Sequence, residues 1–199
     1  MTDQTGRDDA WRAQTDHQAP APPDPWRGAA QHGRRQAQPG PDPIAQPDRS
    51  PASVRALRID PDATSSRLDL PADQAAQRDM LRSLIGGSPD QAVYHRRALL
   101  HVHGSGTRMR LPVNPAAWAL ACAWRGLDLP YLLYGPVVVT GPGTGGALTA
   151  LNDRLLGEAE DVTRRVEELR SEWATRPPAS ESAARLELLA YARRAIRRS

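Results

Sequence analysis

Three histidines are the side chains of this sequence best suited to hold a metal ion. His101 and His103 lie two residues apart in an apolar run, and His95 precedes them on the adjacent segment. Residues two apart on a strand share a face, so we expect His101 and His103 to project together, with His95 on the neighbouring strand. Imidazole binds zinc and other transition metals. The sequence supplies no third firm ligand and no positioned carboxylate, so we interpret these histidines as ordinary polar positions and expect no metal, cofactor or catalytic residue.

A second candidate is a glycine pattern. Gly141, Gly143 and Gly146 satisfy G-x-G-x-x-G between a Val-rich strand and a predicted helix, which is the local context of dinucleotide-binding loops. Such a domain needs another parallel strand after the helix, and no strand pattern follows residue 147. We therefore expect residues 142–146 to be a linker without a bound nucleotide.

Arginine supplies all the positive charge. There are 26 basic residues and none is Lys, while the net charge is only +3. Phe is absent too, which favours codon bias as the explanation. Four of the arginines, Arg193, Arg194, Arg197 and Arg198, end the last predicted helix. They could contact phosphates, but the helix macrodipole also stabilises cations at a helix C-terminus, and we favour that interpretation; Arg96 and Arg97 fit a loop between strands.

The composition excludes several classes of protein. Without Lys there is no Walker A loop and no Schiff-base enzyme. The single thiol, Cys122, excludes a disulfide framework. The chain before residue 147 offers only Asp carboxylates, none spaced as an acid–base pair, so we expect no enzyme activity. No signal-peptide pattern and no apolar run long enough to span a bilayer are found, and we expect a cytoplasmic protein.

Residues 1–52 contain nine Pro and seven Gln and few large apolar residues. Such a segment cannot bury enough surface to offset its conformational entropy, and we expect a disordered tail. It carries D-x-W-R-x4-H twice, around Trp11-Arg12 and Trp26-Arg27. Trp beside Arg is a common interface anchor, which makes these four residues candidates for partner binding. Chance similarity in a biased composition is the alternative.

Residues 53–141 predict a small α+β domain, with a hairpin-rich sheet and two packed helices. We expect strands at 54–59, 64–70, 92–95, 98–103 and 131–140, with Gly104-Ser105-Gly106 as a hairpin turn into residues 107–113. A helix begins after Asp73 and ends before Gly86, and a second begins after Asn114 and ends before Gly126. The Val run at 137–139 is typical of a strand covered on both faces.

Residues 147–199 change to a helical period. Apolar residues at spacings of three and four predict a helix over 147–174, and Pro177-Pro178 separates it from a second helix that begins at Ser180. Glu160 with Arg164, and Asp161 with Arg165, are predicted to pair along its surface. We interpret the segment as an antiparallel helical hairpin or as a coiled-coil arm that self-associates.

Several short motifs occur in a recognisable order, namely IDPD at 59–62, LP at 70–71, IGG at 85–87, LPVN at 111–114 and YGPVVVTG at 134–141. In this order they resemble a small domain-of-unknown-function family of phages, mobile elements and actinobacteria. The resemblance covers residues 53–141. It implies an α+β fold and a setting among mobile-element or accessory genes, and it brings no activity or catalytic residue.

The sequence thus favours a non-enzymatic interaction or accessory protein, with an unknown protein partner bound through the tail or the helical arm. One alternative is an accessory nucleic-acid-binding factor that uses Arg96, Arg97 and the C-terminal Arg cluster on phosphates. A small enzyme or metal-binding domain is the other.

Overall fold

A computed structural model describes residues 53–144 and 147–197 of the chain. The tail predicted at 1–52, with Trp11, Arg12, Trp26 and Arg27, lies outside the described residues. The described elements, in chain order, are β1 (Val54–Ile59), β2 (Ser65–Leu70), α1 (Gln74–Ile85), β3 (Pro89–His95), β4 (Ala98–His103), α2 (Pro115–Arg125), β5 (Val137–Thr144), β6 (Ala147–Thr149), α3 (Asp153–Trp173) and α4 (Glu181–Ile196). This is the α+β class that the sequence predicts.

The strands form one antiparallel sheet in the order β2-β1-β5-β4-β3, and β6 pairs with the far end of β5. The central strand, β5, pairs with both β1 and β4 through its valines: Val139 lies opposite Leu57 on one side and Leu100 on the other. A strand in this position is shielded from water along both edges. The unbroken Val run is therefore the expected sequence for the middle of the sheet.

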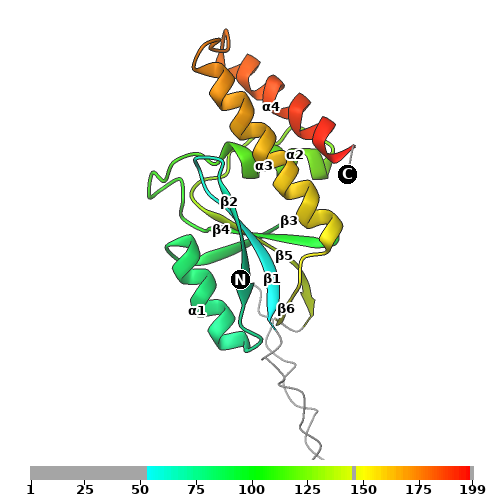
Figure 1. Ribbon diagram of the computed structural model, residues 1–199. Coiled ribbons are helices and arrows are strands. Elements are labelled where there is room, and N and C mark those ends of the chain that lie inside the picture. The colour runs from blue at the N-terminus through cyan, green and yellow to red at the C-terminus, as the bar shows by residue number, and fades with distance from the viewer. Residues whose placement is uncertain (1–52, 145–146, 198–199) are drawn as a thin grey trace, which may run out of the picture. The chain divides into compact units, whose positions relative to one another are not determined.

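Helices cover both faces of the sheet (Figure 1). α1 packs on one face over a small core that contains Val138, Leu81 and Ile85. α2, α3 and α4 cover the other face, where a larger core contains Val137 and Val139. Alternate valines of β5 thus face different helices, which confirms the expectation that this strand is covered on both sides.

The capping residues set the ends of the two helices within the predicted domain. Asp73 accepts a hydrogen bond from the Ala76 amide and begins α1, and Gly86 ends it in the left-handed conformation at φ 77°. Asn114 begins α2 in the same way, and Gly126 ends it at φ 76°. These boundaries are confirmed as predicted.

The linker expected at 142–146 is wrong for the residues that the structure describes. β5 continues to Thr144, and β6 at 147–149 pairs with it antiparallel, so residues 142–144 belong to a strand. The reason is steric: a Cβ on Gly141 would lie 2.4 Å from the Ala150 carbonyl oxygen, and one on Gly143 would lie 1.7 Å from that of Ala147. Here glycine allows backbones to approach closely rather than making the chain flexible.

Two further expectations around the strands are wrong. Residues 104–110 form a succession of turns, and Gly104-Ser105-Gly106 does not close a hairpin, because β4 pairs with β3 and β5 instead. The last strand of the predicted domain begins at Val137 rather than at residue 131. Apolar residues at 131–133 are loop residues, of which Leu133 is buried against the larger core.

α3 and α4 form an antiparallel helical pair, as one of the two expectations for 147–199 had it (Figure 1). The predicted first helix is shorter, because 147–149 form β6 and α3 begins only at Asp153. The pair is not a separate arm. Its apolar seam, which includes Ala159, Val162 and Val166, belongs to the same core as α2, so within the described residues these positions are buried inside the chain.

Candidate functional site

The structure places the three histidines at different sites. His101 and His103 share the face of β4 that α1 covers, as their spacing predicts, and the His103 ring lies against Gly87. His95 instead contacts Trp124 of α2 on the opposite face, with ring centroids 5.6 Å apart. A bulge between Ala92 and His95 breaks the alternation of β3 and turns His95 away from the other two. The described residues contain no cluster of three or more His, Cys, Asp or Glu that could hold a metal ion.

His101 is a buried structural residue, only 1% exposed. Its Nε2 lies 2.9 Å from the Thr140 hydroxyl oxygen on β5. That hydroxyl donates its proton to the Gly141 carbonyl oxygen, so it accepts from His101 Nε2–H. Burial lowers the pKa of His101 to about 4, so the side chain is neutral at pH 7.

Acidification should therefore destabilise the protein through His101. Because the folded state holds the pKa near 4 and the ordinary value is 6.5, the unfolded chain takes up the proton first. The stabilisation is complete above pH 6.5, is lost as the pH falls from 6.5 to 4, and changes no further below, amounting to about 3 kcal/mol. Urea unfolding of wild type and His101→Gln should show this extra loss in wild type alone; equal losses in both would contradict the assignment.

The arginines at the end of α4 lie along one stripe of the helix, on which Arg194 and Arg197 are exposed and Arg193 is half-buried. Leu189, Ala192 and Ala195 turn the opposite side of α4 into the core, which leaves Arg193, Arg194 and Arg197 at spacings of one, three and four on the outer side. These three line a shallow surface hollow together with Ala190. Of the four predicted candidates, Arg198 lies outside the described residues.

Arg193 also marks where this stripe meets α2. Burial raises the pKa of the Cys122 thiol in α2, and the positive charge of nearby Arg193 partly opposes that rise. The stripe therefore borders the C-terminal half of α2, next to the end of the β3–β4 hairpin.

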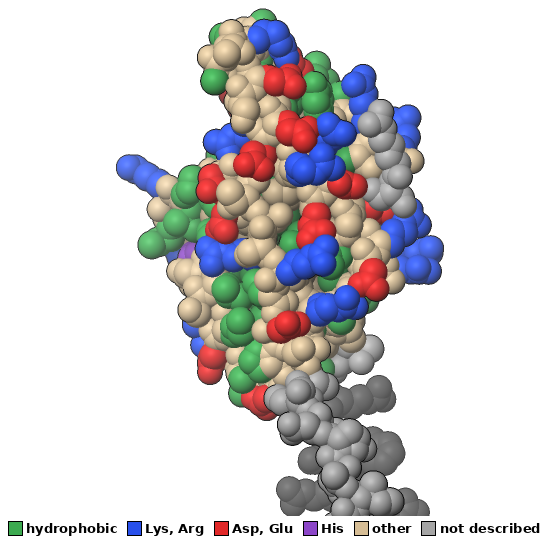
Figure 2. All heavy atoms as spheres, in the orientation of Figure 1, with side chains coloured by type: hydrophobic (Ala, Val, Ile, Leu, Met, Phe, Trp, Pro, Cys, Tyr) green, Lys and Arg blue, Asp and Glu red, His purple; other side chains and the backbone are tan. Residues whose placement is uncertain are grey.

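Arg96 and Arg97 occupy the two-residue turn of that hairpin. Both are exposed, and both line a cavity of about 370 Å³ whose far wall includes Ile196, the residue before Arg197. Spacing along the chain cannot show that this turn shares a cavity with Ile196 of the last helix. The cavity thus brings the turn with Arg96 and Arg97 next to Ile196 of α4, and Figure 2 shows basic side chains, with acidic ones among them, along the edge of the molecule near the end of α4.

These five arginines, Arg96, Arg97, Arg193, Arg194 and Arg197, are called the arginine face below. Among the described residues, no ion pair joins any of them to a carboxylate. Carboxylates do lie near both groups. Asp161 lines a hollow together with Arg194, and Glu158 lines the cavity of Arg96 and Arg97.

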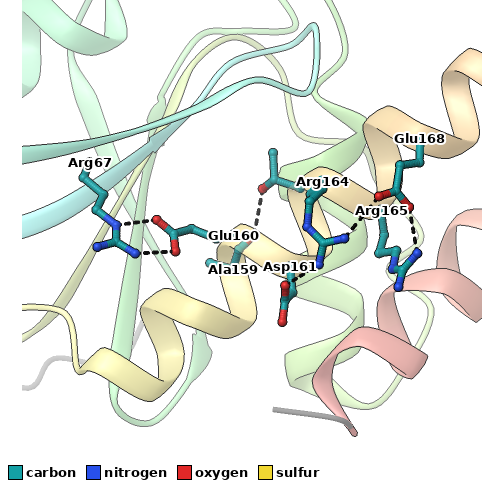
Figure 3. A network of polar contacts seen from close by, with 8 residues as sticks. Arg67, Ala159, Glu160, Asp161, Arg164, Arg165 and Glu168 are labelled. Carbon is teal, nitrogen blue, oxygen red and sulfur yellow. Dashed lines mark hydrogen bonds and ion pairs between the residues drawn. The ribbon is translucent and has the colours of Figure 1, made fainter.

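The outer surface of α3 is different, because Arg164 and Arg165 form ion pairs with carboxylates of the same helix. Arg67 of β2 binds Glu160 through two hydrogen bonds of 2.5 and 2.8 Å (Figure 3). Arg164 bridges Asp161 and Glu168. The predicted pairing of Glu160 with Arg164 is therefore wrong: Glu160 binds across to the sheet, a contact between elements that helical spacing cannot show.

The cavity beside Arg96 and Arg97 is built around a buried carboxylate that the sequence analysis missed. Glu158 of α3 is 2% exposed. Its Oε2 accepts a hydrogen bond of 2.9 Å from Trp124 Nε1, and its Oε1 lies 3.0 Å from Arg154 Nε. Glu158 comes three residues after Leu155 and four before Val162, a spacing that places it on the apolar face of α3. This spacing could have predicted its burial from the sequence.

The remaining candidates can now be placed. Gly141 and Gly143 lie in β5 and are followed by β6, whereas a dinucleotide-binding loop leads directly into a helix. No helix among the described residues combines the length and apolar character needed to cross a bilayer.

No protein-family model matches the chain, and neither a curated protein nor a solved structure shows significant similarity to it. The family resemblance of residues 53–141 stays a prediction, and the function has to be argued from the geometry.

Proposed function

We propose that this protein is a non-enzymatic accessory protein that binds nucleic acid through the arginine face. The observation that carries the proposal is that Arg193, Arg194 and Arg197 line one surface hollow, while Arg96 and Arg97 line a cavity with Ile196, the residue before Arg197. Among the described residues, none of these five arginines forms an ion pair. Guanidinium groups bind phosphate oxygens through two parallel hydrogen bonds. A row of such groups suits the repeated charge of a phosphate backbone.

The macrodipole of α4 does not account for the whole face. It favours cations at the C-terminus of a helix, which explains Arg193, Arg194 and Arg197 as the sequence analysis expected. Arg96 and Arg97 lie in a strand turn, where no helix dipole of their own element stabilises them. Their cavity includes Ile196, the residue before Arg197, and this supports a shared ligand for both groups.

The other parts of the sequence-based hypothesis stay predictions. A protein partner for Trp11 and Trp26 concerns residues outside those described. We include a cytoplasmic location in the proposal, and the single cysteine, Cys122, which is buried and unpaired, fits a reducing compartment.

Replacing Arg193, Arg194 and Arg197 together by alanine should weaken binding to duplex DNA by roughly tenfold or more at low salt, to a similar degree on every sequence. The matched control is Arg78, Arg108 and Arg110 to alanine, which removes the same charge from exposed residues elsewhere in the fold. Fluorescence anisotropy with a labelled duplex measures both affinities. Equal affinities of the two triple variants would refute the proposal.

A further inference from the structure

The cavity between the β3–β4 turn and the three helices combines cations with an aromatic wall. Its volume is about 370 Å³, in the range of sites that enclose one small ligand. Trp124 forms part of one wall, His95 lies against it, and Arg96 and Arg97 lie at the turn. Single-stranded nucleic acids are bound by this combination, in which a base stacks on an aromatic ring and cations hold the backbone.

The aromatic wall is fixed in place before any ligand arrives. The hydrogen bond from Trp124 Nε1 to Glu158 holds the indole in one orientation. Arg154 occupies the other oxygen of that carboxylate, so the buried charge is neutralised within the wall. A preorganised ring loses little conformational entropy when a base stacks on it.

Once Arg154 and Glu158 are paired, the remaining charge of the cavity is positive and belongs to Arg96 and Arg97. Arg154 is paired with Glu158, whereas the turn arginines have no carboxylate partner among the described residues. Burial lowers the pKa of His95, which favours the neutral form of its ring. Its Nδ1 accepts a hydrogen bond from the Arg97 amide, so in the neutral ring Nε2 carries the proton and is a donor. The cavity thus offers a stacking surface, a neutral donor and two cations.

We infer that this cavity receives one unpaired nucleotide, with its base on Trp124 and its phosphate on Arg96 and Arg97. The inference rests on the proposed function and extends it: the strand that supplies the nucleotide continues over Arg193, Arg194 and Arg197. A base within a duplex is stacked and paired and cannot enter a cavity of this size. The protein therefore prefers single strands, or duplexes with frayed ends, to blunt duplexes.

The test compares a labelled single strand with a blunt-ended duplex for wild type and two Trp124 variants. Trp124→Leu should bind the single strand roughly tenfold more weakly and the duplex as wild type does, because a stacked base is lost. Trp124→Phe, which keeps a ring, should retain most of the single-strand affinity. An unchanged single-strand affinity in Trp124→Leu would overturn the inference while the proposed function stands.

A second variant tests the inference independently, in case replacing Trp124 disturbs the fold. Arg96 and Arg97 are exposed in a turn, so their joint replacement by alanine should leave the far-UV circular dichroism and thermal midpoint unchanged. It should weaken binding of the single strand more than of the duplex. Equal weakening of both would place these arginines on the general phosphate face and overturn the cavity's role.

Competition by a nucleoside monophosphate distinguishes the two sources of such a nucleotide. Displacement of the single strand only by a large excess supports a nucleotide within a strand. Displacement at comparable concentrations assigns the cavity to a free nucleotide and overturns the inference that a strand supplies it. If wild type binds neither nucleic acid, the proposed function itself fails.

Discussion

Replacing Asn114 with alanine should lower the free energy of unfolding by about 3 kcal/mol or more. Asn114 is fully buried, and its side chain makes three hydrogen bonds. Nδ2 donates to the carbonyl oxygens of Ile59 at 2.9 Å and Gly135 at 3.0 Å, and Oδ1 accepts from the Ala117 amide at 3.0 Å. One residue therefore caps α2 and ties it to β1 and to the loop before β5.

The expected loss of unfolding free energy is large because the hydrogen-bond partners of Asn114 stay buried after the substitution. Alanine would leave two buried carbonyls and one helix amide without partners, and each such group costs about 1–3 kcal/mol. Asn152 provides a matched control, because it also caps a helix but is exposed and accepts one bond, from the Arg154 amide. Asn152→Ala should cost about 1 kcal/mol. Urea denaturation that gave equal losses for the two variants would contradict this account of Asn114.

Gly141→Ala should destabilise the protein by about 2–3 kcal/mol. The new Cβ would lie 2.4 Å from the Ala150 carbonyl oxygen and 2.5 Å from Thr149 Oγ1. Neither group can move freely: Thr149 pairs with Gly141 in the β5–β6 ladder, and its hydroxyl donates to the Pro142 carbonyl oxygen at 2.6 Å. The β5–β6 ladder would have to open to accept the methyl group.

The same substitution at Gly157 should have the opposite sign. Gly157 lies within α3, where an added Cβ meets nothing within 4 Å, so alanine should stabilise the helix by up to about 1 kcal/mol. Thermal unfolding of the two variants beside wild type measures both effects. If Gly141→Ala proved neutral or stabilising, the stretch would behave as the linker that the sequence suggested.

The sequence predicted the elements whose signals are local. Asp73, Asn114 and the glycines at the two helix ends act within a few residues of themselves, so their side chains identify the boundaries directly. The Val run reveals a strand covered on both faces, because only such a strand has no solvent side. These features give the α+β class and most of the strands of the sheet.

The rest depends on contacts between elements distant in sequence. The apolar seam of α3 shows that one face is buried, but not whether α2, α4 or a second chain covers it. Gly141 and Gly143 have the composition of a linker, and only the positions of Ala147 and Ala150 show that they are packed against backbone. The missed strand, β6, has three residues, too few for any period to be visible.

The candidate site was partly visible in the sequence for the same reason. The Arg run at the end of α4 is a local feature and was found. Its interpretation as a binding surface depends on the turn at Arg96 and Arg97, about a hundred residues earlier. It also depends on the absence of carboxylates ion-paired with these arginines in the described part of the chain. Glu158 could have been recognised as buried, but its partners Trp124 and Arg154 could not both be inferred from spacing.

The most direct test of nucleic-acid binding by the arginine face is the salt dependence of affinity. Each arginine–phosphate contact should contribute about 0.7–0.9 to the slope of log K against log salt concentration. We predict that wild type has a steep negative slope, and that the variant with alanine at 193, 194 and 197 has a slope shallower by about 2–3. Identical slopes for the two proteins, or no binding by wild type at the lowest salt concentration, would contradict the account.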